Sequence, residues 1–182
     1  MKHAVCFALI LVGSAHASRS LPIPRVASQT FKTEGLYEGG NAASANIEAF
    51  RVSENAGVER WVLDFSDNIK RELGSVAPHF QIRYLPGDKI IGSDGLPIMA
   101  KPAKFILTLR GIRKNFLQRH ALQELVKKSL FVKEITVYPP IEEGDTAIEL
   151  ILKDNVSFEP HQPVQKEGRL VLDLKALGNE KL

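Results

Sequence analysis

The histidine, cysteine and acidic residues of this 182-residue chain form no recognisable catalytic or metal-binding motif. His79, His120 and His161 lack metal-ligand spacing, and the sequence contains neither HExxH nor GxSxG. The acidic run at 142–145 has the composition of a turn. Cys6 is the single cysteine, which excludes a disulfide within the chain and a zinc site built from several cysteines. We therefore predict no enzymatic activity, no metal and no cofactor.

Two short segments instead carry arginine and aspartate at strand spacing. Arg60 and Asp64 flank one segment, and Arg169 and Asp173 flank the other. Side chains two residues apart share one face of a strand, so these charges lie opposite the apolar residues of both segments. One interpretation is a solvated face with cross-strand ion pairs, each contributing less than about 1 kcal/mol. The other is a polar platform for sugar and peptide contacts, on which arginine binds carboxylates through its planar fork.

Further basic residues could enlarge such a platform. Arg83 lies on the matching face of the segment 80–84, and Arg110 ends the segment 105–109 with the same parity. The residues between 112 and 129 add a third basic group, which consists of Arg113, Lys114, Arg119, Lys127 and Lys128. This group could meet anionic lipid or an anionic polymer, or it could simply keep the surface soluble.

Strands must position most of these residues, because apolar and polar residues alternate with a period of two along much of the chain. The alternating segments are 61–65, 80–84, 105–109, 132–137, 148–152 and 170–174. The segment from Ile112 to Ser129 differs, since its apolar residues recur at spacings of three and four. This spacing predicts one amphipathic helix that connects two sets of strands.

The two sets of strands resemble each other. Segments 47–68 and 132–155 each contain two strand patterns, an intervening glycine and a final Asp-Asn pair, with the same separation between glycine and Asp-Asn. Each set ends in a further strand, at 104–109 and at 169–174. Any two amphipathic hairpins share some of this likeness, but the common spacing favours a duplication. We expect a mostly-β fold, a sandwich of two related small sheets with one connecting α-helix.

The remaining segments suggest export. Residues 1–17 combine a basic start, a short apolar run and a final Ala-His-Ala, which is typical of a signal peptide. The alternative is a membrane anchor, but the apolar run is too short to cross a bilayer. Residues 18–45 contain scattered Pro, Gly and Ser and predict a flexible linker. We therefore expect one domain at 46–176, a tail at 177–182, no transmembrane span after cleavage, and a periplasmic or secreted location.

The domain resembles the AMIN family, which is found at the amino end of N-acetylmuramoyl-L-alanine amidases and in type IV pilus secretins. The resemblance rests on the secretory start, the Pro/Ser-rich segment and the two Arg/Asp strand segments, and it covers roughly Asn46 to Ala176. It departs from the family in the length of the helix and in an inserted loop at 97–102. The resemblance implies a β-sandwich that places its protein on peptidoglycan or at an envelope assembly.

These observations favour a non-catalytic binding domain of the cell envelope. Peptidoglycan is the first expected ligand, with Arg60, Asp64, Arg83, Arg110, Arg169 and Asp173 as candidate binding residues. The alternative is a periplasmic adaptor that binds an envelope protein, such as a pilus secretin or a division factor, at a sheet edge. Nucleic acid is not expected, because the net charge is only +3 and no nucleic-acid-binding motif is present.

Overall fold

We describe residues 31–67, 77–140, 144–163 and 168–177 of a computed structural model of the chain. The expected signal peptide at 1–17, residues 18–30 of the expected linker and residues 178–182 of the tail lie outside these ranges. Within them the fold is mostly β with one helix, as predicted. No helix in this part of the chain has the length and apolar character needed to span a bilayer.

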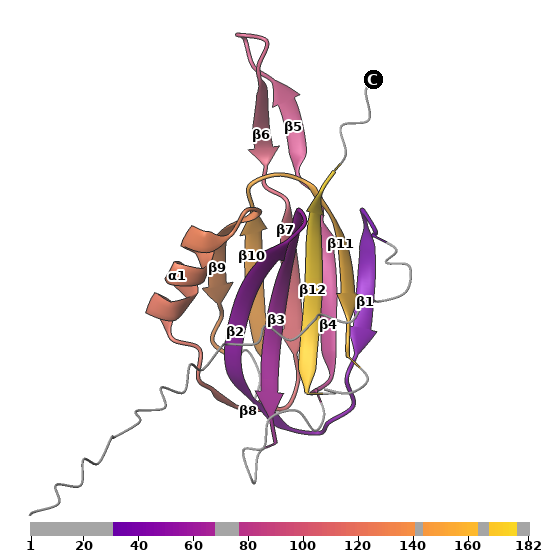
Figure 1. The fold of residues 1–182 in the computed structure, drawn as a ribbon, viewed down its shortest axis with the longest axis vertical. Coiled ribbons are helices and arrows are strands. Elements are labelled where there is room, and N and C mark those ends of the chain that lie inside the picture. Colours follow the sequence, from indigo (N-terminus) through magenta and orange to yellow (C-terminus); the bar gives the residue numbers. More distant parts are fainter. Residues whose placement is uncertain (1–30, 68–76, 141–143, 164–167, 178–182) are drawn as a thin grey trace, which may run out of the picture.

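Two five-stranded sheets make up the body of the molecule (Figure 1). Sheet A has the order β11 (Val156–His161), β12 (Arg169–Ala176), β3 (Val58–Ser66), β2 (Ala45–Asn55) and β8 (Ile112–Asn115). Sheet B has the order β1 (Gly35–Gly39), β4 (Phe80–Leu85), β7 (Lys104–Leu109), β10 (Thr146–Leu152) and β9 (Val132–Val137). Neighbouring strands are antiparallel, except that β8 runs parallel to β2.

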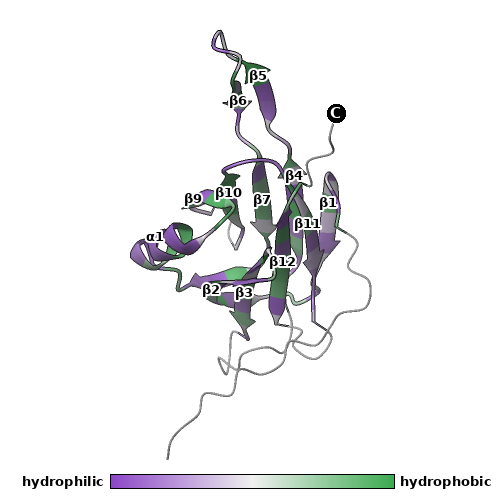
Figure 2. Cartoon of the chain, turned by 45° about the horizontal axis from the view of Figure 1, so that its top comes forward, coloured by the Kyte–Doolittle hydropathy of each residue, from purple (hydrophilic) through white to green (hydrophobic). Residues whose placement is uncertain are grey.

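The core lies between the two sheets, because each strand turns its apolar residues inward. Hydrophilic and hydrophobic residues alternate along the strands in Figure 2, and Trp61, Phe65, Phe80 and Phe105 are fully buried. The ring centroids of Phe105 in sheet B and Phe158 in sheet A are 5.0 Å apart in an edge-to-face contact. A single apolar cluster therefore joins both sheets.

The predicted half-repeat is present in the strand order. If β2, β3, β4 and β7 correspond to β9, β10, β11 and β12, the run β11-β12-β3-β2 of sheet A becomes β4-β7-β10-β9 of sheet B. Each half thus contributes one pair of strands to each sheet. The two halves are interleaved rather than placed side by side.

The residue register repeats as well. Trp61 lies opposite Leu172 in sheet A. The equivalent residues of sheet B, Ile148 and Leu107, also lie opposite each other. Both hairpins contain a register shift at the equivalent place, between β2 and β3 and between β9 and β10. Since alternation alone sets neither partner nor register, this agreement supports a duplication.

A hairpin interrupts one half-repeat and projects from the body (Figure 1). It consists of β5 (Asp88–Ile91) and β6 (Pro97–Lys101), so the segment expected to be an inserted loop at 97–102 is mostly a strand. Its position between β4 and β7 corresponds to the short connection 162–168 between β11 and β12. The hairpin is therefore an addition to the repeated unit.

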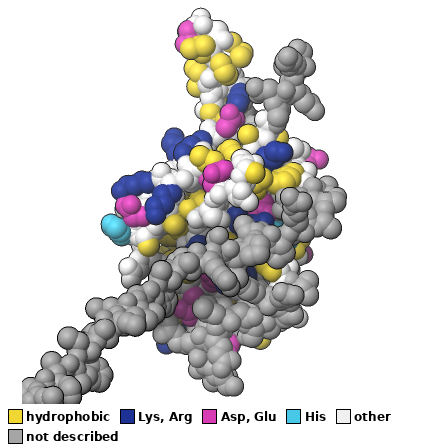
Figure 3. All heavy atoms as spheres, in the orientation of Figure 1, with side chains coloured by type: hydrophobic (Ala, Val, Ile, Leu, Met, Phe, Trp, Pro, Cys, Tyr) yellow, Lys and Arg dark blue, Asp and Glu magenta, His cyan; other side chains and the backbone are white. Residues whose placement is uncertain are grey.

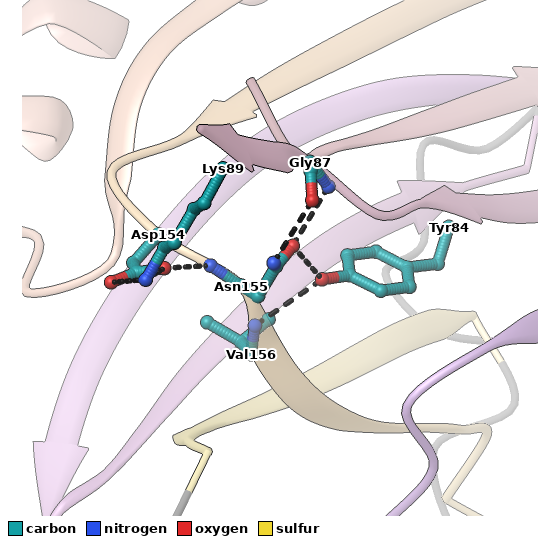
Figure 4. A network of polar contacts seen from close by, with 6 residues as sticks. All are labelled: Tyr84, Gly87, Lys89, Asp154, Asn155 and Val156. Atoms are coloured by element: carbon teal, nitrogen blue, oxygen red, sulfur yellow. Dashed lines mark hydrogen bonds and ion pairs between the residues drawn. The ribbon is translucent and has the colours of Figure 1, made fainter. Parts of the chain in front are cut away.

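Asn155 holds the base of this hairpin against the body (Figure 4). Its side-chain oxygen accepts hydrogen bonds from Gly87 N at 2.8 Å and from Tyr84 Oη at 3.2 Å, and its amide donates to Gly87 O at 3.1 Å. Lys89 adds an ion pair to Asp154 at 2.7 Å. Burial raises the pKa of the Tyr84 hydroxyl, which keeps it in the protonated, donating form.

The predicted helix is wrong over its first part. Helix α1 spans only Arg119–Lys128, and Ile112–Asn115 forms β8 instead. Gly111 adopts a φ of 72° between β7 and β8, and its carbonyl accepts a hydrogen bond from Ala45 N at 3.0 Å. The turn thus delivers β8 to the edge of β2, where tertiary backbone pairing overrides the local helical spacing.

The predicted linker is also wrong where the structure describes it. β1 pairs with β4 along its whole length, and Tyr37 packs on Phe80 with ring centroids 5.9 Å apart. Lys32 exchanges two backbone hydrogen bonds with Phe158 at 2.8 Å. The Pro/Gly/Ser composition does not predict this strand and this bridge, because their stability comes from the sheet edges that they cover.

Candidate functional site

The first candidate surface is the outer face of sheet A, where two of the predicted residues form an ion pair. Arg60 lies opposite Asp173 in the register of β3 and β12. Its Nε and Nη2 donate to the two carboxylate oxygens at 2.7 Å each, in the bidentate geometry typical of strong arginine–carboxylate pairs. The hydrogen bond to Asp173 raises the pKa of Arg60 further above its already high value.

Asp64 is the centre of a second ion-pair group on this face. Arg51 of β2 donates to both carboxylate oxygens of Asp64 at 2.6 and 2.8 Å. Arg169 of β12 donates to the same carboxylate at 2.8 Å. The alternation of β2 places Arg51 on the polar side of the strand, so this parity could have identified it from the sequence.

The outer face of sheet A is less open than a solvated platform would be. The Asp173 side chain has 0% of its surface exposed and that of Asp64 8%, whereas Arg60 retains 23%. The four residues predicted on this face, Arg60, Asp64, Arg169 and Asp173, are therefore together. They satisfy one another, which leaves the two carboxylates buried and only part of the guanidinium groups accessible.

Two titratable residues of β11 lie beside the Arg60–Asp173 pair. Glu159 lies opposite Asp173 and His161 lies opposite Val171. Burial lowers the pKa of the His161 imidazole, because desolvation disfavours its charged form. Neither Glu159 nor His161 was among the binding residues predicted from the sequence.

Arg83 and Arg110 do not extend the platform. Arg83 is on β4 and Arg110 follows β7, and both strands belong to sheet B. Their outward side chains therefore lie on the opposite side of the sandwich from Arg60 and Asp173. Strand parity indicates the face of a residue within its own sheet, but it does not assign the strand to a sheet.

The second candidate surface is an open groove of about 1460 Å³ between β8, α1 and β9. One wall follows residues 111–115 of β8 and its preceding turn, and the other follows Lys133–Tyr138 of β9 and its end. Arg119, Leu122, Gln123 and Val126 of α1 form the third side. Because successive strand residues point to opposite faces, contact with every residue from 133 to 138 places the groove along the edge of β9.

The groove combines an apolar floor with a basic rim. Ile112 and Leu122 are buried at its base, with Val126, Ile135 and Val137 partly buried beside them. The charged residues that line it are Arg113, Lys114, Arg119, Lys133 and Glu134. In Figure 3 dark blue Lys and Arg side chains gather around α1 on the same side of the molecule. Arg113, Lys114 and Arg119 belong to the basic group predicted between residues 112 and 129, whereas Lys133 was not predicted.

Glu59 fixes the junction of α1 and β9, which connects the groove residues Val126 and Lys133. It lies on the core side of β3 with 1% of its surface exposed. Its carboxylate accepts hydrogen bonds from Trp61 Nε1 at 2.7 Å, from Ser129 Oγ at 2.6 Å and from the backbone N–H of Leu130. Ser129 Oγ in turn accepts from Val132 N at 2.7 Å, so one buried carboxylate connects the helix end to the strand start.

Neither surface contains an evident metal centre. Across the described ranges no three His, Cys, Asp or Glu residues lie close enough together to hold a metal ion. Both surfaces are suited to binding through hydrogen bonds, ion pairs and apolar contacts.

Comparison of the chain with known protein families finds no matching family model, and comparison with curated proteins finds no match. The resemblance to the AMIN family therefore stays a prediction.

Proposed function

We propose that this protein is a non-catalytic binding domain of the cell envelope, and that it serves as an adaptor for another envelope protein. The observation that carries the proposal is the groove along the edges of β8 and β9. Strand edges offer backbone donors and acceptors that a second chain can pair with. The signal-like composition of residues 1–17 supports an exported location, periplasmic or secreted.

In-cell crosslinking tests the adaptor proposal. A photo-reactive amino acid at Lys114 or Lys133 places the probe in the groove, and one at Arg83 places it on the outer face of sheet B as a control. We expect a discrete protein adduct from the two groove positions and none from position 83. Equal labelling from all three positions would contradict a specific adaptor site.

Peptidoglycan remains the second candidate ligand, and the outer face of sheet A favours it. Arg51 keeps 52% of its side chain exposed while it holds Asp64, so part of its guanidinium can reach a carboxylate of a glycan or stem peptide. Pull-down of the protein with purified sacculi tests this candidate. Retention that falls in Arg51→Ala but not in Arg83→Ala would support it, and complete recovery in the soluble fraction would exclude it.

A further inference from the structure

We infer that the groove between β8, α1 and β9 binds an extended acidic segment of a partner protein, which adds as a strand to the edge of β9. This inference rests on the proposed adaptor function and specifies the chemistry of the partner. It combines three features of the groove: an unpaired strand edge, a size suited to a peptide, and a basic rim over an apolar floor.

The outer edge of β9 has backbone N–H and C=O groups that an added strand could pair with. β9 pairs only with β10 among the described strands. Tyr138 N donates to Ala147 O at 2.9 Å, so Tyr138 belongs to a hydrogen-bonded pair of the antiparallel ladder. Because such pairs alternate with pairs that make no mutual hydrogen bonds, the N–H and C=O groups of Ile135 and Val137 point away from β10. These groups face the groove.

The size of the groove favours a peptide over a small molecule. Its volume of 1460 Å³ exceeds the range of about 300–1,000 Å³ common for small-molecule pockets. It also runs along six consecutive residues of one strand edge, Lys133–Tyr138. A segment of similar length in the extended conformation matches this shape.

The charges of the groove select the kind of segment. Four basic residues and one acidic residue line it, so an acidic occupant is favoured electrostatically. Ile112 and Leu122 at the base accept apolar side chains. Since side chains of a strand alternate, a segment with acidic and apolar residues in alternation satisfies both the rim and the floor.

Charge argues against the chain's own amino-terminal region as the occupant. Residues 18–30 contain Arg19 and Arg25 but no acidic residue, and Pro22 and Pro24 remove two backbone donors. A partner of opposite charge therefore fits the groove better than this segment does.

Peptide binding to residues 18–182, the protein without its expected signal peptide, tests the inference. The probe is a fluorescein-labelled peptide of alternating Glu and Val, about eight residues long to span the edge. The control peptide alternates Lys and Val. We expect the Glu-Val peptide to bind at least about tenfold more tightly, with affinity that falls as salt is added. Equal binding of the two peptides, or no binding, would overturn the inference.

Two sets of variants locate the binding site. Arg113→Glu with Lys114→Glu and Lys133→Glu reverses the rim, and we expect it to weaken Glu-Val binding by at least about tenfold. Arg83→Glu with Lys101→Glu and Lys128→Glu changes the net charge equally at exposed positions outside the groove and serves as the matched control. Equal loss in both sets would show a nonspecific charge effect and overturn the proposed site.

Backbone pairing has its own readout. On peptide binding, amide hydrogen exchange should slow at Ile135 and Val137, whose N–H groups face the groove. Val137→Pro removes one outward N–H without removing a β9–β10 bond, and it should abolish binding while the thermal unfolding transition remains cooperative. Peptide binding without slower amide exchange at Ile135 and Val137 would overturn strand addition. Self-association of the protein that depends on the groove charges would show that a second copy of the chain, and not an acidic partner, occupies the groove, which would also overturn the inference. If the Glu-Val peptide does not bind but the groove positions still form a protein adduct in cells, only this inference is wrong. If the groove positions form no adduct in cells, the proposed adaptor function is wrong.

Discussion

At the residue scale, the ion pairs of sheet A stabilise the domain because their carboxylates are buried. Asp173 is fully buried and Asp64 nearly so, and a buried carboxylate that loses its cation has a high desolvation cost. The arginines that bind the two aspartates differ in exposure, since Arg60 keeps 23% of its side chain exposed and Arg51 keeps 52%. Asp173 has a bidentate pair with Arg60, whereas Asp64 has both Arg51 and Arg169.

This difference predicts unequal effects of two arginine substitutions. Arg60→Ala should lower the free energy of unfolding by about 3 kcal/mol, because it removes the bidentate partner of a buried carboxylate. Arg51→Ala should cost about 1 kcal/mol or less, since Arg169 still pairs with Asp64 and Arg51 is half exposed. Urea unfolding measures both values. Equal costs would contradict the role of burial, and the small expected cost makes Arg51→Ala the suitable variant for the sacculus experiment.

The pKa of His161 predicts a loss of stability in mild acid. Burial and the nearby Arg60 lower the pKa of the folded imidazole, while Asp173 and Glu159 raise it and only partly offset burial. The unfolded chain therefore binds a proton more readily than the folded chain. The stability that this difference contributes is present above the unfolded pKa of about 6.5 and is lost as the pH falls toward the folded pKa.

Thermal unfolding of wild type and His161→Gln, followed between about pH 7.5 and pH 5.5, measures this effect. The wild type should lose more stability over this interval than the variant, which cannot take up the proton. An identical pH dependence would show that His161 does not contribute. Other groups that titrate over the interval affect both proteins alike.

At the element scale, the β5–β6 hairpin contributes little to the fold. Ile90, Ile91, Leu96 and Ile98 are all at least half exposed, and an isolated two-stranded hairpin is marginally stable in water. The two chain segments at its base lie in tight contact, since a Cβ added to Gly87 would lie 2.6 Å from Lys101 O and from Ala103 N. The equivalent connection in the other half-repeat, residues 162–168, is much shorter.

Replacement of residues 90–99 by a two-residue Asn-Gly turn should therefore leave the domain folded. We expect a change in the free energy of unfolding of about 1 kcal/mol or less, since Lys89 and the Asn155 contacts at the base are retained. Chemical denaturation measures this change. Loss of the cooperative transition would show that the hairpin is part of the core unit.

At the scale of the whole molecule, the interleaved half-repeat makes each half dependent on the other. β3 pairs with β12 in sheet A, and β7 pairs with β10 in sheet B. Each central pairing therefore joins one half to the other. Separation would expose the inner faces of both sheets at once.

We predict that residues 31–115 and 116–177 do not fold when produced separately, and that they recover structure when mixed. Trp61 reports the assembly, because it is fully buried and lies opposite Leu172 of the other half. Its fluorescence should shift to shorter wavelength on mixing, together with a gain of β signal in far-UV circular dichroism. A cooperative transition of either fragment alone would contradict the interleaving.

Much of the local structure follows from the sequence because local patterns control it. Alternation identifies the core side of β3, β4, β7, β10 and β12, and the shared spacing of glycine and Asp-Asn indicates the half-repeat. It also places Arg60 and Asp173 on one polar face, where they pair. β1 and β8 escaped prediction because short strands at sheet edges gain their stability from a partner far away in the sequence.

The mostly-β class, the duplicated pattern and the polar face that carries Arg60 and Asp173 all follow from residue patterns along the chain. The division of strands between the sheets, which separates Arg83 and Arg110 from Arg60 and Asp173, follows from the three-dimensional fold alone. The same holds for the groove, whose walls come from β8, α1 and β9. The physical reason is that a period of two specifies the face of each strand, whereas long-range backbone hydrogen bonds and the closure of one core select its neighbours.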